Sequence, residues 1–145
     1  MSTSQRGITT AVREPAAVVT AGLPGVPESV REARALVRQA LGAGHPAAEA
    51  AALCASELVT NAIAYSRSGR PGGYVELAVA GLPGAAYLTV RDGGGRPGPA
   101  ARAPGDGHGC GLAIVAAMSA AWGTETDSGG RVTWCVITGG AGSEH

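Results

Sequence analysis

Residues 47–64 constrain the fold more than any other part of this 145-residue chain. Their Ala, Leu, Cys, Val and Ile residues cover nearly every side of the helix that the spacing predicts. Pro46 suits the first turn of such a helix, and the stretch 66–69 is typical of a turn that ends it after Tyr65. A helix that is apolar all round has to be buried, so we expect this one to lie against a sheet.

The rest of the chain predicts the remaining elements. Ser29 with Glu32 three residues later has the capping-box pattern, which predicts a first helix that ends at Gly42 or Gly44. After the buried helix, apolar residues alternate with period two in two successive strands, and a third helix and a strand pair follow. The expected ranges are 75–79 and 86–90 for the strands, about 110–121 for the helix, and 122–126 and 131–138 for the closing pair. This order predicts an α+β fold, a two-layer sandwich in which a mixed or antiparallel sheet carries helices on one face.

Length, charge and cysteine count set the class of protein. We expect one domain over 21–138, between a flexible N-terminal segment, 1–20, and a flexible tail, 139–145. The 11 basic and 11 acidic residues give a net charge of zero, which argues against a general nucleic-acid binder. No apolar run reaches the ~18–20 residues of a membrane span and no signal peptide is evident, so a cytoplasmic protein is expected. The 3 cysteines and 3 histidines lack metal-site spacing, which predicts reduced and mostly buried thiols.

Two polar features interrupt the apolar pattern. Glu57 and Asn61 lie four residues apart and share one face of the apolar helix, where an ionised carboxylate is costly unless it is paired, hydrogen-bonded or metal-bound. Asp92 continues the inward face of its strand at the C-terminal end, and glycines at 93–95 allow a ligand or another backbone to come close. The alternatives are a Glu–Asn hydrogen bond that faces water and an ordinary Asp-Gly turn.

A glycine-rich stretch, 107–111, leads directly into the third helix. Backbone N–H groups ahead of a helix N-terminus bind phosphate oxygens, and the helix dipole favours their negative charge. The stretch lacks the GxGxxG spacing directly after a strand that a Rossmann fold requires. The chain contains no lysine, which excludes a P-loop.

In combination, these stretches resemble the GHKL ATPases, a superfamily that includes gyrase, sensor histidine kinases and the anti-sigma-factor serine kinases. Residues 57–62, 90–94 and 109–115 follow the order and spacing of that superfamily, and the resemblance runs from about residue 23 to residue 137. Residues 57–69 and 122–134 are most similar to the small standalone histidine-kinase-like domains of the anti-sigma regulatory type from actinobacteria. The resemblance implies the Bergerat ATP-binding fold.

The resemblance also implies a role for each polar feature. Asp92 would accept the exocyclic amine of adenine, because a carboxylate only accepts hydrogen bonds. Asn61 would offer its amide oxygen to Mg²⁺ between the phosphates, and Glu57 would be the general base towards a hydroxyl or water. The further nucleotide-binding residues that it implies are Gly109 and Gly111 at the phosphates, and Gly94, Leu112 and Thr133 around the rest of the nucleotide.

Three positions depart from the pattern of that superfamily. Arg96 stands where the last glycine of the first glycine box is usual, and Tyr65 stands where this group often has histidine. Val132 precedes Thr133, whereas many relatives have threonine and then valine. We expect these departures to affect the shape of the nucleotide pocket and its affinity.

The resemblance leaves more than one function open. The first is a Mg²⁺- and ATP-dependent serine/threonine protein kinase of the anti-sigma type, which phosphorylates a serine of an anti-sigma-factor antagonist and sequesters a sigma factor. Glu57 favours this function, because a base at this place suits transfer to a hydroxyl. The alternatives are a non-catalytic, nucleotide-gated module that regulates a partner by binding, and a scaffold with a vestigial pocket. A homodimer, as in the sigma-binding relatives, is a further open expectation.

Overall fold

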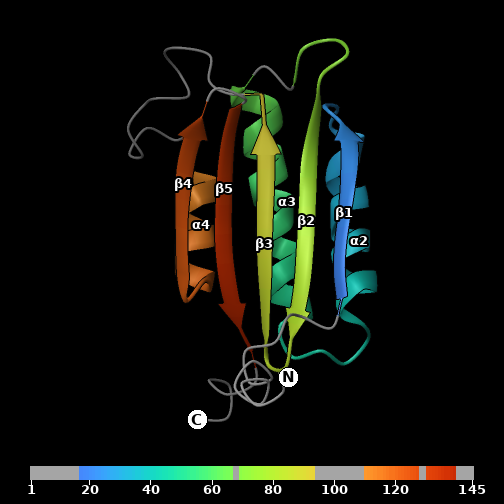
Figure 1. The fold of residues 1–145 in the computed structure, drawn as a ribbon, viewed down its shortest axis with the longest axis vertical. Helices are drawn as coiled ribbons and strands as arrows, with labels where there is room; N and C mark the ends of the chain where they lie inside the picture. The colour runs from blue at the N-terminus through green and yellow to red at the C-terminus, as the bar shows by residue number, and fades with distance from the viewer. Residues whose placement is uncertain (1–16, 67–68, 94–109, 128–129, 140–145) are drawn as a thin grey trace, which may run out of the picture.

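The computed structural model describes residues 17–66, 69–93, 110–127 and 130–139. In chain order, its elements are β1 (Ala17–Pro24), α2 (Glu28–Leu41), α3 (Ala48–Tyr65), β2 (Tyr74–Leu82), β3 (Ala85–Asp92), α4 (Cys110–Met118), β4 (Ala121–Asp127) and β5 (Gly130–Thr138). The described strands form one sheet in the order β1-β2-β3-β5-β4, and every neighbouring pair is antiparallel. The described helices all cover the same face of that sheet (Figure 1). The predicted α+β sandwich is therefore confirmed, with an antiparallel sheet.

α3 is the buried helix that the apolar segment predicts. It packs against α2, α4 and the sheet, mainly β3 and β2. Its completely buried side chains include Ala51, Cys54, Ala55 and Val59, which share one core cluster with the inward residues of the strands. Although α3 is apolar, no helix in the described ranges is long and apolar enough to cross a membrane. Because Glu57 and Asn61 belong to α3, packing of the core fixes the backbone of both.

The start of α2 differs from the prediction. Ser29 is not an N-cap, because α2 begins one residue earlier, at Glu28. Pro27 precedes it with a φ of −56°, which already suits a helix, so no side-chain cap is needed to set the chain direction. The Ser29 hydroxyl instead donates to the carbonyl oxygen of Pro24 at 2.6 Å. It thereby ties the first turn of α2 to the end of β1.

His45 performs the capping at the start of α3. The N-cap residue, Ala47, has no side chain that can accept a hydrogen bond, and its N–H donates to His45 Nδ1 at 3.0 Å. Because Nδ1 accepts, the ring proton belongs on Nε2, which donates to the Leu82 carbonyl oxygen at 2.9 Å. His45 therefore links the start of α3 to the end of β2.

The strand β1 was not predicted. Residues 17–20, which the sequence pattern assigns to a flexible N-terminal segment, form its first half and pair with β2. Glycine and proline at positions 22–25 resemble a turn, whereas Val19, Ala21 and Leu23 alternate inward opposite the core residues of β2. An edge strand needs only one neighbour, so β2 supplies the backbone pairing that the local sequence does not indicate.

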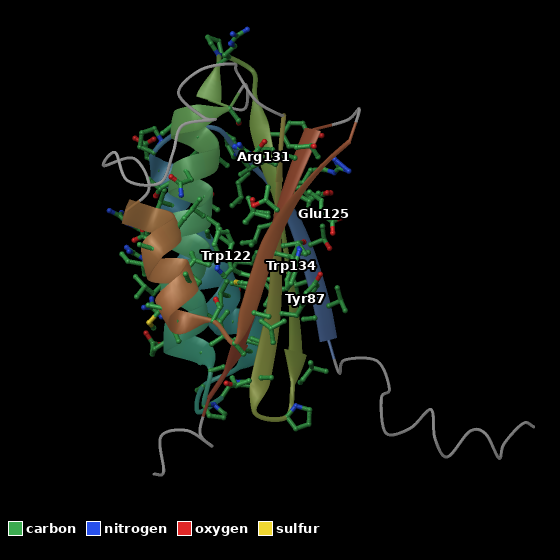
Figure 2. All side chains as sticks on the ribbon, turned by 90° about the vertical axis from the view of Figure 1, so that its left-hand side faces the viewer. Tyr87, Trp122, Glu125, Arg131 and Trp134 are labelled. Atoms are coloured by element: carbon green, nitrogen blue, oxygen red, sulfur yellow. The ribbon has the colours of Figure 1, made fainter. Side chains whose placement is uncertain are left out.

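The face of the sheet away from the helices carries an aromatic pair. Tyr87 of β3 and Trp134 of β5 have ring centroids 6.5 Å apart and planes inclined by 30°. Trp134 extends over Gly123 of β4, where a Cβ would lie 2.9 Å from the indole ring. Figure 2 shows Tyr87 and Trp134 on this face, and Trp122 and Arg131 on the side of the helices. The period-two alternation along β5 therefore places Arg131 on the helix-covered face of the sheet, the face on which Asp92 is expected.

Candidate functional site

The polar residues of interest belong to elements that meet at one end of the sandwich. β3 ends there at Asp92, β5 begins there at Gly130, and α3 ends there at Tyr65 (top of Figure 1). α4 begins at Cys110 toward this end and runs away from it. A carboxylate at a strand end and the N-terminus of a helix are therefore brought to the same end of the molecule.

Asp92 is buried and paired with an arginine that the sequence pattern did not single out. Its side chain is 3% exposed, on the inward face that it shares with Leu88 and Val90. Arg131 lies directly opposite in the β3–β5 register. Its Nη2 and Nε donate to a single carboxylate oxygen of Asp92, Oδ2, at 3.1 and 3.3 Å. Residue spacing alone could not identify this pair, because the two residues are 39 positions apart in the chain and meet only through the register of β3 and β5.

Gly130 brings the start of β5 against the backbone of Asp92. Its φ of +142° is one that other residues rarely adopt, and a Cβ on it would collide with the Asp92 carbonyl oxygen. The close approach is therefore possible only for glycine. Because Arg131 is the next residue, the close approach also sets where its side chain starts relative to the Asp92 carboxylate.

Asn61 carries a buried polar atom without a hydrogen-bond partner among the described residues. The atom is Nδ2, and the amide oxygen and nitrogen of an asparagine can be exchanged by a flip of the side chain. The neighbouring hydroxyls of Ser56 and Thr60 bond back to helix carbonyl oxygens at 2.9 and 2.7 Å, so the helix satisfies them itself. An unsatisfied buried amide costs about 1–3 kcal/mol, so Asn61 is a candidate for contact with a ligand.

Glu57 is half-buried and lies one helical turn before Asn61, on the same side of α3. With the amide oriented as in the structure, Nδ2 is the only side-chain donor of Asn61 and it does not bond to Glu57, so the Glu–Asn hydrogen bond is not seen among the described residues.

The other predicted site residues are distributed as follows. Thr133 is half-buried on the inward face opposite Val90, and its hydroxyl lies 3.4 Å from that of Thr124. The Val132–Thr133 order therefore puts the threonine, not the valine, on the face of Asp92. Gly111 and Leu112 lie in the first turn of α4, and Leu112 packs partly against the core. Residues Gly94, Arg96 and Gly109, and the side chain of Tyr65, lie outside the described part of the chain.

The thiols and acidic groups of the described ranges form no metal cluster. No group of three His, Cys, Asp or Glu side chains there could hold a metal ion. Cys54 and Cys135 are free and buried, as predicted, while the side chain of Cys110 lies outside the described residues. A divalent ion at Asn61 would therefore need oxygen ligands from a bound molecule, which is how Mg²⁺ commonly binds beside phosphates.

Two hollows on the described surface lie away from these residues. One of about 630 Å³ adjoins the end of β1 and the turn before β2, and one of about 890 Å³ adjoins the α2–α3 connection. The second contains the exposed ion pair Arg38–Glu49, at 2.9 Å, in which the hydrogen bond from Arg38 lowers the pKa of Glu49. Exposed pairs of this kind contribute little to stability and indicate no ligand. The buried groups at Asp92 and Asn61 remain the candidate site.

Comparison with known proteins identifies the family of the chain. The family model of the histidine kinase-like ATPase domain matches residues 23–137, which include β1 from Leu23, the whole of α3 and most of β5. No match is found among curated proteins. The matched range contains Glu57, Asn61, Asp92 and Arg131, and it covers well over half of the chain. The chain therefore belongs to the family of histidine kinase-like ATPase domains.

Proposed function

We propose that this ATPase domain binds ATP at Asp92 and Asn61 and acts as a serine/threonine protein kinase of the anti-sigma type. The observation that carries the proposal is the unsatisfied, buried amide of Asn61, on the same side of α3 as a carboxylate that does not bond to it. Asp92, buried at the end of β3, supports a base-recognition point at the same end of the sandwich. Its acceptor-only side chain suits the exocyclic amine of adenine.

The residues present fit a magnesium ion. Asn61 would hold it through the amide oxygen, with phosphate oxygens and water as the other ligands, because Mg²⁺ prefers oxygen and retains several waters. When bound, Mg²⁺ neutralises charge that develops on the transferring phosphoryl group. A flip of the Asn61 amide is enough to present oxygen rather than nitrogen at the buried position.

Glu57 is the proposed general base. It takes the proton of a serine hydroxyl on a partner protein, here an anti-sigma-factor antagonist. The serine oxygen then forms a bond to the γ-phosphorus as the bond from that phosphorus to its bridging oxygen breaks, and ADP leaves. Backbone N–H groups of Gly109 and Gly111, ahead of and within the first turn of α4, would hold the phosphates.

Thermal unfolding with and without excess Mg·ATP tests the binding half of the proposal. A ligand at ~100 times its Kd stabilises the folded protein by about 2.7 kcal/mol, which should raise the Tm of the wild type by about 5–15 °C. Asp92→Asn should lose most of this shift, because the amide carries an NH₂ donor in place of one of the two acceptor oxygens that suit the adenine amine. Glu76→Gln, an exposed carboxylate on β2, is the matched control and should keep it. A wild type that shows no shift up to millimolar nucleotide would leave only the scaffold function.

Phosphoserine formation tests the catalytic half. Wild type, Mg·ATP and an anti-sigma-factor antagonist from the source genome should yield a phosphoserine detectable by mass spectrometry. Glu57→Ala should abolish the product while it retains the ATP-dependent Tm shift. A wild type that binds ATP and regulates the partner without producing phosphoserine would support the non-catalytic binding module instead.

A further inference from the structure

We propose that Arg131 is a positioning residue for nucleobase selection. In this proposal, its guanidinium holds the Asp92 carboxylate so that the site takes a 6-aminopurine nucleotide and rejects a 6-oxopurine nucleotide. The inference rests on the proposed function, since it gives a selectivity to the base-recognition point at Asp92. It adds a residue that neither the sequence pattern nor the family assignment singles out.

The ion pair between Arg131 and Asp92 is largely shielded from solvent. Both donating nitrogens of Arg131 converge on the same oxygen of Asp92, at 3.1 and 3.3 Å. The arginine side chain is only 19% exposed and the carboxylate 3%, so water screens the pair weakly. The two residues are direct partners in the β3–β5 register, and Gly130 lets the backbone of β5 lie close to the Asp92 carbonyl oxygen. The sheet therefore fixes the two backbone positions from which the side chains of the pair extend.

Such a pair orients the acceptor. The last torsion of an aspartate is soft, so an unrestrained carboxylate rotates over a broad range. Two N–H groups of Arg131 that converge on Asp92 Oδ2 hold that oxygen in place and so restrict the rotation of the carboxylate. An acceptor held in one orientation accepts a hydrogen bond from an amine at the purine 6-position. An oxo group at the same position has no hydrogen to donate, and it leaves the carboxylate facing another acceptor.

The pair also occupies a donor that would otherwise favour the wrong base. Guanidinium groups donate readily to O6 and N7 of an oxopurine. While Arg131 donates to Asp92, those N–H groups are directed at the carboxylate and away from the base. Removal of the arginine therefore should not improve binding of an oxopurine, and its effect should fall on the adenine nucleotide.

The test compares Mg·ATP with Mg·ITP, which differ at the purine 6-position, by isothermal titration calorimetry on the full chain. Wild type should bind ATP about 30-fold more tightly than ITP, as expected when one buried acceptor faces an acceptor. Arg131→Met keeps an unbranched side chain as long as the arginine stem and removes the donors, so the ratio should fall below about 5-fold through weaker ATP binding. Arg131→Lys keeps the charge without the two-pronged contact and should give an intermediate ratio.

Arg91→Met is the matched control. Arg91 directly precedes Asp92, but on the opposite face of the sheet, so this variant removes the same charge nearby without touching the pair. It should keep the wild-type ratio, which separates positioning from a general loss of attraction for a polyanion. Circular dichroism melts establish that each variant is folded, and if Arg131→Met does not fold, the ratio of Arg131→Lys decides.

The outcomes separate this inference from the function on which it rests. Wild type that binds ATP selectively, with an unchanged ATP-to-ITP ratio in the Arg131 variants, overturns the role of Arg131 and leaves the ATP site intact. Equal weakening of both nucleotides has the same meaning, since it indicates a structural role only. Failure of the wild type to bind ATP at all overturns the proposed function and this inference together.

Discussion

At the scale of single residues, glycine decides how close β5 can come to Asp92. We predict that Gly130→Ala destabilises the protein by about 2–4 kcal/mol, because the new methyl group meets the Asp92 carbonyl oxygen and the backbone is held at a positive φ. Gly72→Ala is the matched control. It has a φ of +83° but open space around the Cβ position, so only the backbone term of about 1 kcal/mol applies. Urea unfolding of both variants measures the difference, and equal losses would contradict a collision at Gly130.

Single residues also show what the sequence could and could not predict. Period two along β3 placed Asp92 on the inward face, and helical spacing placed Glu57 and Asn61 on one side of α3, because both inferences need only local geometry. Arg131 could not be found in this way, since its role follows from pairing across the sheet. The N-cap assignment of Ser29 was wrong for a different reason: α2 already begins at Glu28, directly after Pro27.

At the scale of elements, α3 and β5 are joined by a pair of buried thiols. Cys54 and Cys135 are completely buried, and the hydrogen bond between them lowers the pKa of Cys54, while the same bond, together with burial, raises the pKa of Cys135. The Cys135 thiol therefore stays protonated in the folded protein where it ionises in the unfolded chain, near a pH of about 8.5. Its contribution to stability is present in full below that pH and is lost as the pH rises above it.

We predict that the free energy of unfolding of the wild type falls by about 1.4 kcal/mol per pH unit more steeply than that of a Cys54→Ala/Cys135→Ala variant above about pH 8.5. Other titrating groups are shared by the two proteins and cancel in the comparison. Urea unfolding between pH 7.5 and 9.5, with a reducing agent present, gives the two slopes. Parallel slopes would show that the buried thiols ionise as freely in the folded protein as in the unfolded chain.

The elements themselves differed in how far local sequence determined them. α3 was predictable because a helix that is apolar all round has to be buried in the core. β2 and β3 were predictable because buried and exposed residues alternate along them. β1 was missed because its glycine and proline are local turn signals, and because its ladder is supplied entirely by β2. Tertiary pairing outweighed local preference there.

At the scale of the whole molecule, the sheet order separates a protected centre from exposed edges. β5 is the last of the described strands along the chain but lies between β3 and β4 in the sheet, so β4 and β1 are the edge strands. β3 and β5 each pair with a neighbour on both sides, and their inward residues Leu88 and Ile137 are completely buried, whereas β1 pairs only with β2. Amides of the central strands should therefore exchange with solvent mainly through global unfolding, and those of the edge strand through local fraying.

This difference predicts how nucleotide binding spreads through the molecule. Mg·ATP at ~100 times its Kd lowers the population of the globally unfolded state about 100-fold, so exchange of β3 and β5 amides should slow by that factor. Amides of β1 should not change, because fraying of the edge does not require the nucleotide to leave. Hydrogen exchange followed by NMR, with and without Mg·ATP, measures the central strands and the edge strand in one experiment, and Asp92→Asn should lose most of the slowing. Equal slowing in β1 and β3 would mean that the edge opens only together with the core, which contradicts a separation set by the order of the strands.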